Sequence, residues 1–126
     1  MNGSWDGWKT ILDSNNTADY VVEQGTSGIW TYRKWNSGVA ECWGKTSVSG
    51  SATMLETTVS LPFTFSSNDY IVNMTPSLNG TITNAFLVAT SAGNEGRTTT
   101  SFKISHQTSS TGYSVVYMLN VSGRWK

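Results

Sequence analysis

The sequence predicts an all-β fold, an antiparallel, jelly-roll-like β-sandwich with little or no helix. Segments rich in β-branched and aromatic residues recur along the 126 residues, and clusters of Ser, Asn, Asp and Gly separate them. Helical periodicity is nearly absent. Ser and Thr fill about 36 positions, whereas charged residues make up 13% of the chain, a balance typical of β-rich surfaces. The connections are too short for helical crossovers, so we expect antiparallel strands.

This pattern gives nine candidate strands in order along the chain. They are Trp8 to Leu12, Tyr20 to Glu23, Ile29 to Trp35, Val39 to Thr46, Met54 to Leu61, Tyr70 to Thr75, Ile82 to Thr90, Thr99 to His106 and Tyr113 to Val121. The last strand alternates apolar and mixed positions, which is typical of a central strand. Turn clusters at residues 92–96 and 109–112 predict two successive hairpins. The apolar run Ala85 to Ala89 suits a buried strand, with a short buried helix as the alternative.

Residues 20–44 hold three of the six tryptophans and read as a β-hairpin. Its two strands flank the loop Asn36-Ser37-Gly38, in which the glycine can adopt a positive φ. A type I turn followed by a bulge is the usual geometry for such a loop. The register that follows pairs Trp35 with Val39, Arg33 with Glu41, and Thr31 with Trp43.

Alternation along these strands gives the hairpin two aromatic faces. One face carries Trp30, Tyr32 and Lys34, and the other carries Trp35 and Trp43. Two such faces left in water would form large exposed apolar patches. We therefore expect one face to meet the domain core and the other to meet a neighbour, a partner or a ligand.

Three parts of the chain contain distinctive motifs: EQG, WTYRKW, SG and AECWG in the hairpin, Leu61-Pro62-Phe63-Thr64-Phe65 in mid-chain, and the closing Ser122-Gly123-Arg124-Trp125-Lys126. Together these motifs resemble the C-terminal domains of phage and prophage tail-fibre or minor structural proteins. The opening Gly3-Ser4-Trp5-Asp6-Gly7-Trp8-Lys9 resembles the last strand of a preceding tail-fibre repeat of the pyocin-knob kind.

The resemblance implies a division of the chain and a place of action. Residues 1–12 would end a preceding repeat or linker, and residues 13–126 would form the C-terminal β-sandwich domain. The implied location is the tail of a virion, after expression in the bacterial cytoplasm without a signal peptide. Fibres of this class are commonly homotrimeric, so other chains of the same fibre are expected partners. The resemblance assigns no binding residues.

The charge balance bears on other partners. Eight basic residues offset eight acidic ones, and no basic run exceeds Arg33-Lys34, which argues against nucleic acid as a partner. No apolar run approaches the ~20 residues needed to cross a bilayer, so we expect no membrane insertion. The single cysteine, Cys42, cannot form an internal disulfide, so an apolar core or association between chains must stabilise the fold.

The favoured function is recognition of a bacterial cell-surface glycan without catalysis. Aromatic rings suit the apolar faces of sugars, and Asn, Ser, Thr and Arg supply directional hydrogen bonds. The candidate ligand-binding residues are Trp30, Tyr32, Arg33 and Trp35. Two alternatives stay open: the aromatics only pack a small core, or the domain is a structural trimeric cap or spacer of the fibre.

A polysaccharide-degrading tail enzyme is a third reading. It would need two carboxylates flanking the scissile bond, and none of the eight acidic residues forms an evident pair. The sequence contains no GxSxG, HExxH, P-loop or CxxC motif. Cys42 with His106 as its base is a formal nucleophile, but a cysteine in an aromatic strand is more often inert core. With one histidine a His-based metal site is not expected. We therefore predict no catalytic residues, no metal and no cofactor.

Overall fold

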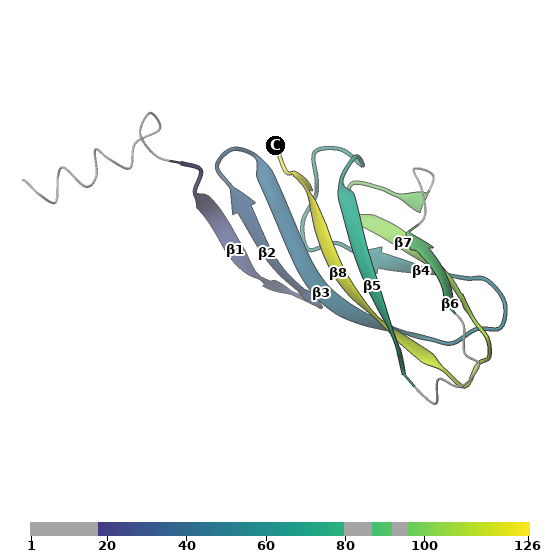
Figure 1. Ribbon diagram of the computed structural model, residues 1–126. Coiled ribbons are helices and arrows are strands. Elements are labelled where there is room, and N and C mark those ends of the chain that lie inside the picture. The colour runs from purple at the N-terminus through teal and green to yellow at the C-terminus, as the bar shows by residue number, and fades with distance from the viewer. Residues whose placement is uncertain (1–17, 80–86, 92–95) are drawn as a thin grey trace, which may run out of the picture.

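The computed structural model describes residues 18–79, 87–91 and 96–126, which form two antiparallel sheets packed as a sandwich (Figure 1). The strands are β1 (Val21–Ser27), β2 (Trp30–Trp35), β3 (Val39–Ser49), β4 (Leu55–Ser60), β5 (Ile71–Asn79), β6 (Leu87–Ser91), β7 (Ser101–Thr108) and β8 (Ser114–Arg124). One sheet has the order β1-β2-β3-β8-β5, and the other has the order β4-β7-β6. The all-β sandwich predicted from the sequence is confirmed.

The eight strands lie within or close to eight of the predicted segments. The remaining segment, Trp8 to Leu12, and the proposed boundary at residue 12 lie outside the described residues, as do residues 82–86 of the predicted strand Ile82 to Thr90. Pro76 falls in β5, an edge strand of its sheet, where a residue without a backbone N–H is tolerated. Among the described residues, no helix is long and apolar enough to cross a membrane.

The prediction of two successive hairpins is half right. β6 and β7 are antiparallel neighbours, as expected. β7 and β8 are not, because the chain leaves the three-stranded sheet after Thr108 and β8 enters the other sheet between β3 and β5. A turn cluster marks where a strand ends, but it carries no information about which sheet the next strand joins. The prediction that this last strand is central is confirmed.

The core lies between the two sheets. From the five-stranded sheet it takes Trp30, Ala40, Cys42, Val48, Val115, Tyr117, Leu119 and Val121, and from the other sheet Val59, Phe102 and Ile104. The segment between β4 and β5 adds Phe65 and Tyr70, whose rings stack with their centroids 4.8 Å apart. Burial of these side chains is the main force that holds the sheets together.

A buried polar pair closes one part of this core. His106 Nδ1 lies 2.8 Å from the hydroxyl of Tyr117, and His106 Nε2 lies 3.0 Å from the carbonyl oxygen of Ser49. Because a carbonyl can only accept, Nε2 carries the proton and Nδ1 accepts from Tyr117. Both ring nitrogens are therefore satisfied inside the core, and neither serves Cys42 as a base.

The β2–β3 hairpin has the predicted register. Arg33 pairs with Glu41 and Thr31 with Trp43, and the paired residues run as far as Lys34 and Ala40, one step before Trp35 and Val39. Gly38 has a φ of 101°, and its N–H donates to the carbonyl of Trp35 at 3.0 Å. A Cβ on Gly38 would lie 2.9 Å from the backbone oxygen of Lys126, so this position favours glycine on two counts.

Side chains near the C-terminus hydrogen-bond to this turn. Arg124 Nη2 donates to the carbonyl of Ser37 at 2.7 Å, and the indole N–H of Trp125 donates to the carbonyl of Trp35 at 2.9 Å. Asp19 holds the turn from the other side, because its carboxylate accepts from the hydroxyl and the N–H of Ser37. The hydroxyl bond is the main reason that the pKa of Asp19 lies below its ordinary value.

Candidate functional site

The two faces of the β2–β3 hairpin have different surroundings. Its inner face packs against the other sheet and the β4–β5 segment, where Tyr32 meets Phe63 with ring centroids 5.6 Å apart. Trp30 on this face is only 3% exposed. The outer face has no sheet above it among the described residues, and its side chains are open to a partner or ligand.

The outer face is organised by a cation–π contact. The guanidinium carbon of Arg33 lies 5.3 Å from the ring centre of Trp43. Glu41 is the cross-strand neighbour of Arg33, yet the ion pairs between described residues are Lys34–Glu23 and Lys103–Glu56. Arg33 therefore rests on the indole, and its donors stay available to a ligand.

Two rows of side chains cross the sheet around this contact. One row follows Gln24, Arg33, Glu41 and Ser122 and ends at the exposed Ile71 of β5, and the next follows Thr31, Trp43, Asn120 and Asn73. We call these residues without Ile71 the Trp43 face. Apart from the indole they are polar, and β1, β2, β3, β8 and β5 all contribute, so the strands fix the spacing of the face.

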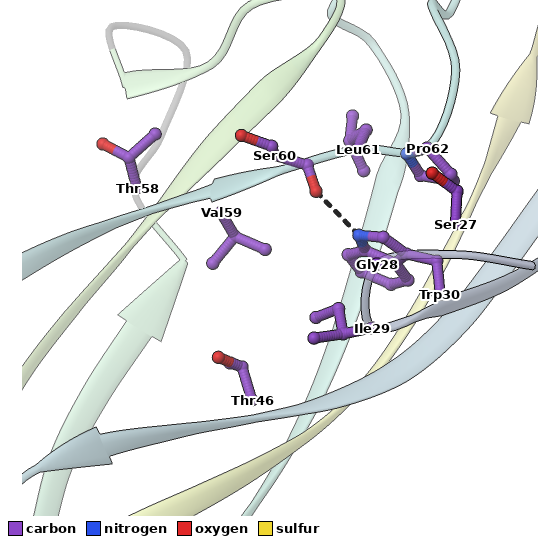
Figure 2. A pocket seen from close by; sticks show the side chains of 10 residues that line it. All are labelled: Ser27, Gly28, Ile29, Trp30, Thr46, Thr58, Val59, Ser60, Leu61 and Pro62. Atoms are coloured by element: carbon purple, nitrogen blue, oxygen red, sulfur yellow. Dashed lines mark hydrogen bonds between the residues drawn. The ribbon is translucent and has the colours of Figure 1, made fainter.

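A separate cleft of about 310 Å³ lies where the β1–β2 turn approaches the edge strand β4 (Figure 2). We call it the hairpin cleft. Its apolar lining consists of Ile29, Trp30, Val59, Leu61 and Pro62. Its remaining lining consists of Gly28 and the hydroxyl residues Ser27, Thr46, Thr58 and Ser60.

Trp30 is held in a fixed position beside the hairpin cleft. Its indole N–H donates to the carbonyl of Ser60 at 2.7 Å, as Figure 2 shows, and its ring meets the ring of Phe102 edge-on with centroids 6.5 Å apart. In the same view Val59 from β4 and Thr46 from β3 point toward one another across the open space. The cleft is thus preformed by the packing of the two sheets.

The four residues nominated from the sequence do not form one site. Trp30 and Tyr32 lie on the inner face, and Arg33 and Trp35 lie on the outer side of the hairpin. Trp35 is half-buried at the end of β2, where its carbonyl accepts from Trp125. Trp125 itself is half-buried against the core. The structure brings Arg33 together with Trp43, which the sequence reasoning did not nominate although the predicted register placed the two on one side.

The structure offers no accessible nucleophile at Cys42. Cys42 is fully buried, and burial raises the pKa of its thiol to about 12. A thiol with such a pKa is not a nucleophile near neutral pH. Among the described residues, no group of three or more His, Cys, Asp or Glu side chains is placed to hold a metal ion.

The fold places the chain in the class of antiparallel β-sandwiches built from two sheets, and no other described strand covers the outer face of the five-stranded sheet. No protein-family model and no curated protein matches this sequence. Solved structures do match, and all three are R-type pyocin tail fibres.

The N-truncated R1-type pyocin tail fibre has a TM-score of 0.53 and 13% identity, with 95% of this chain and 97% of that chain covered. A C-terminal fragment of the R2 pyocin fibre of P. aeruginosa has a TM-score of 0.51 and 19% identity, and the corresponding R1 fragment has a TM-score of 0.54 and 13% identity. Each covers 86% of this chain, which spans 26% and 30% of those two chains. The chain therefore shares the fold of these tail-fibre domains, in agreement with the resemblance seen in the sequence.

Proposed function

We propose that the chain is a tip domain of a phage or phage-like tail fibre and binds a saccharide on the bacterial surface without cleaving it. Its place of action is then the tail of the particle, and its partners are a surface glycan and other chains of the fibre. The shared fold with pyocin tail fibres supports the fibre role. The Trp43 face supports binding.

One observation carries the saccharide proposal: Trp43, Arg33 and Asn120 are side by side on an uncovered, rigid sheet. An indole offers an apolar surface to the C–H groups of a pyranose, and guanidinium and amide groups hydrogen-bond its hydroxyls. Strands also hold these groups more accurately than loops do, which reduces the entropy lost on binding.

Binding without catalysis fits the acidic content of the Trp43 face. Glycoside hydrolysis ordinarily uses two carboxyl groups about 5–9.5 Å apart. Among the eight residues of this face, Glu41 alone carries a carboxylate. A second carboxylate would have to come from outside the face, and we therefore propose recognition rather than hydrolysis.

A structural cap or spacer of a trimeric fibre is the second candidate. Three apolar side chains on the outer side of the same sheet are exposed, namely Val39, Ile71 and Met118, with Ile71 at 62%. Such side chains suit a subunit interface as well as solvent. If a neighbouring chain covers them, the domain is oligomeric, and light scattering of the purified chain measures whether the number of subunits is three.

The test of the proposed function is cell binding. The fluorescently labelled 126-residue chain, in its native oligomeric state, is added to a panel of bacterial strains before and after periodate oxidation of their surface glycans. We expect binding restricted to certain strains and lost on oxidation, with Trp43→Ala weakening it at least tenfold and Thr75→Ala leaving it unchanged. A folded chain that binds no strain would favour the structural cap.

A further inference from the structure

We propose that the hairpin cleft is a second binding site on this domain and that it takes a single uncharged sugar ring. The proposal rests on the proposed function, because it assigns a particular ring of the glycan to a place separate from the Trp43 face. Four features of the cleft support it: its size, its polar edge, its lack of charge and the open turn that forms one wall.

The size and rigidity of the cleft suit a small ring. Its volume of about 310 Å³ is at the lower end of the range of about 300–1,000 Å³ that small-molecule sites occupy. Trp30 is fixed by its bond to Ser60 and by Phe102, and Val59 is anchored in the core. A preformed apolar wall of this kind binds a ring without first being ordered.

The edge of β4 supplies directional hydrogen bonds. Leu61 N–H donates to the carbonyl of Thr100 at 2.9 Å, so Leu61 directs its backbone groups toward the β7 side. Because bonding alternates along an antiparallel pair, the N–H and C=O of Thr58 and the N–H of Ser60 point away from β7. That is the side on which the Ser60 carbonyl meets Trp30. β4 pairs with β7 alone among the described strands, so these groups can serve a ligand.

The charge of the lining selects an uncharged ligand. None of the 10 lining residues has an ionisable side chain. A carboxylate or ammonium group brought into such a cleft would lose hydration without gaining an opposite charge. The Trp43 face differs, since it presents both Arg33 and Glu41. The two sites should therefore discriminate between charged and neutral parts of one glycan.

The β1–β2 turn forms one wall of the cleft. β1 ends at Ser27 and β2 begins at Trp30, so Gly28 and Ile29 form a two-residue loop, with Gly28 at a φ of 59°. Glycine at the first position of a two-residue loop is typical of a type II′ turn, and the second position here is an isoleucine that is 43% exposed and lines the cleft. A Cβ on Gly28 would meet nothing within 4 Å, so the mouth of the cleft beside it is open.

The test follows individual groups by NMR. The ¹⁵N-labelled full chain is titrated with a panel of neutral methyl glycosides of common bacterial hexoses, deoxyhexoses and N-acetylhexosamines, and the Trp30 and Trp43 indole signals are monitored with the amides of Thr58 and Ser60. We expect at least one glycoside to shift the Trp30 and β4 signals saturably while Trp43 stays in place. Thr58→Glu should weaken that binding at least tenfold, and the matched surface change Thr75→Glu should leave it intact.

The contrary outcomes separate this proposal from the proposed function. If no neutral glycoside moves Trp30 or the β4 amides while the chain still binds cells, the hairpin cleft is not a sugar site and the proposed function stands. If the chain binds neither a glycoside in the hairpin cleft nor any bacterial strain, both the sugar site and the proposed function are wrong. If extended peptides, and no sugars, shift the β4 amides, the edge of β4 accepts an added strand and the sugar assignment is wrong.

Discussion

Trp30 and Trp43 belong to the same hairpin and lie on opposite faces of the same sheet, and their surroundings differ in kind. Trp30 is enclosed by core residues, and its N–H is committed to the carbonyl of Ser60. Trp43 faces outward, carries the guanidinium of Arg33 and has polar neighbours. The comparison teaches that a tryptophan-rich hairpin can bury one indole in the core and turn another outward, because alternation along each strand divides its side chains strictly between the two faces.

The largest expected effect is on stability. Trp30→Ala removes a buried indole and should lower the free energy of unfolding by about 3–5 kcal/mol. Trp43→Ala removes a partly exposed ring and a surface cation–π contact, which should cost about 1 kcal/mol or less. Urea denaturation followed by circular dichroism measures both. Equal losses for the two variants would remove the distinction between the faces.

Deleting a hydroxyl from each face sharpens the same comparison. Tyr117→Phe leaves the buried Nδ1 of His106 without its donor, and an unsatisfied buried acceptor costs about 1–3 kcal/mol. Thr31→Val deletes a hydroxyl on the exposed face and should change the stability by no more than about 0.5 kcal/mol. Denaturation of both variants against the parent chain gives the two values. A Tyr117→Phe variant as stable as the parent would show that the pair contributes nothing.

The inner face should also make the fold sensitive to alkali. Burial raises the pKa of Cys42 from 9.0 to about 12 and the pKa of Tyr117 from 10.0 to about 12. The stability that each group contributes is fully present below its pKa in the unfolded chain. It is lost as the pH rises toward its pKa in the folded chain, because in that pH range the unfolded chain binds fewer protons than the folded chain. The slope for each group is at most about 1.4 kcal/mol per pH unit.

Urea midpoints measured between pH 8 and pH 11 test this expectation. The midpoint should fall above about pH 9, and Cys42→Ala should make the fall shallower. The native thiol should also resist a thiol-specific reagent at pH 8 and react only when urea is added. Rapid reaction of the native chain would mean that the inner face opens to solvent.

The smallest expected changes in stability concern two consecutive residues, Arg33 and Lys34, which lie on opposite faces of the sheet. Lys34 faces inward, pairs with Glu23 at 3.1 Å and lies over the rings of Phe63 and Trp125, so Lys34→Ala should cost about 1 kcal/mol. Arg33→Ala should cost about 0.5 kcal/mol, but it should change the Trp43 fluorescence and weaken cell binding severalfold. Reversed effects on stability and binding would contradict the assignment of the faces.

Short-range features of the sequence were sufficient to predict the strand pairing of the hairpin. The Asn36-Ser37-Gly38 loop predicted the pairing of Arg33 with Glu41, and the structure has that pairing. The apolar alternation after Tyr113 likewise predicted a central strand, and β8 is one. Both features depend on residues close together in the chain or on the period of a single strand, which a sequence displays directly.

Long-range packing accounts for what the sequence did not predict. Alternation separates Trp30 from Trp43, but which of two aromatic faces turns inward depends on where the other sheet lies. The hairpin cleft joins residues 27–30 to residues 58–62, and no local pattern links these segments. Arg33, one of the residues nominated for ligand binding, faces outward, whereas Trp43 was passed over although the predicted register placed it on the same side as Arg33.

The position of β8 has a consequence for how the chain reaches this fold. β8 lies between β3 and β5, so both neighbours lack their partner until residues 114–124 have been synthesised. The bond from Arg124 to Ser37 spans 87 residues, and that from Trp125 to Trp35 spans 90. Such high contact order predicts slow folding. Until β8 is inserted, β3 and β5 present open edges on which nascent chains can pair with one another.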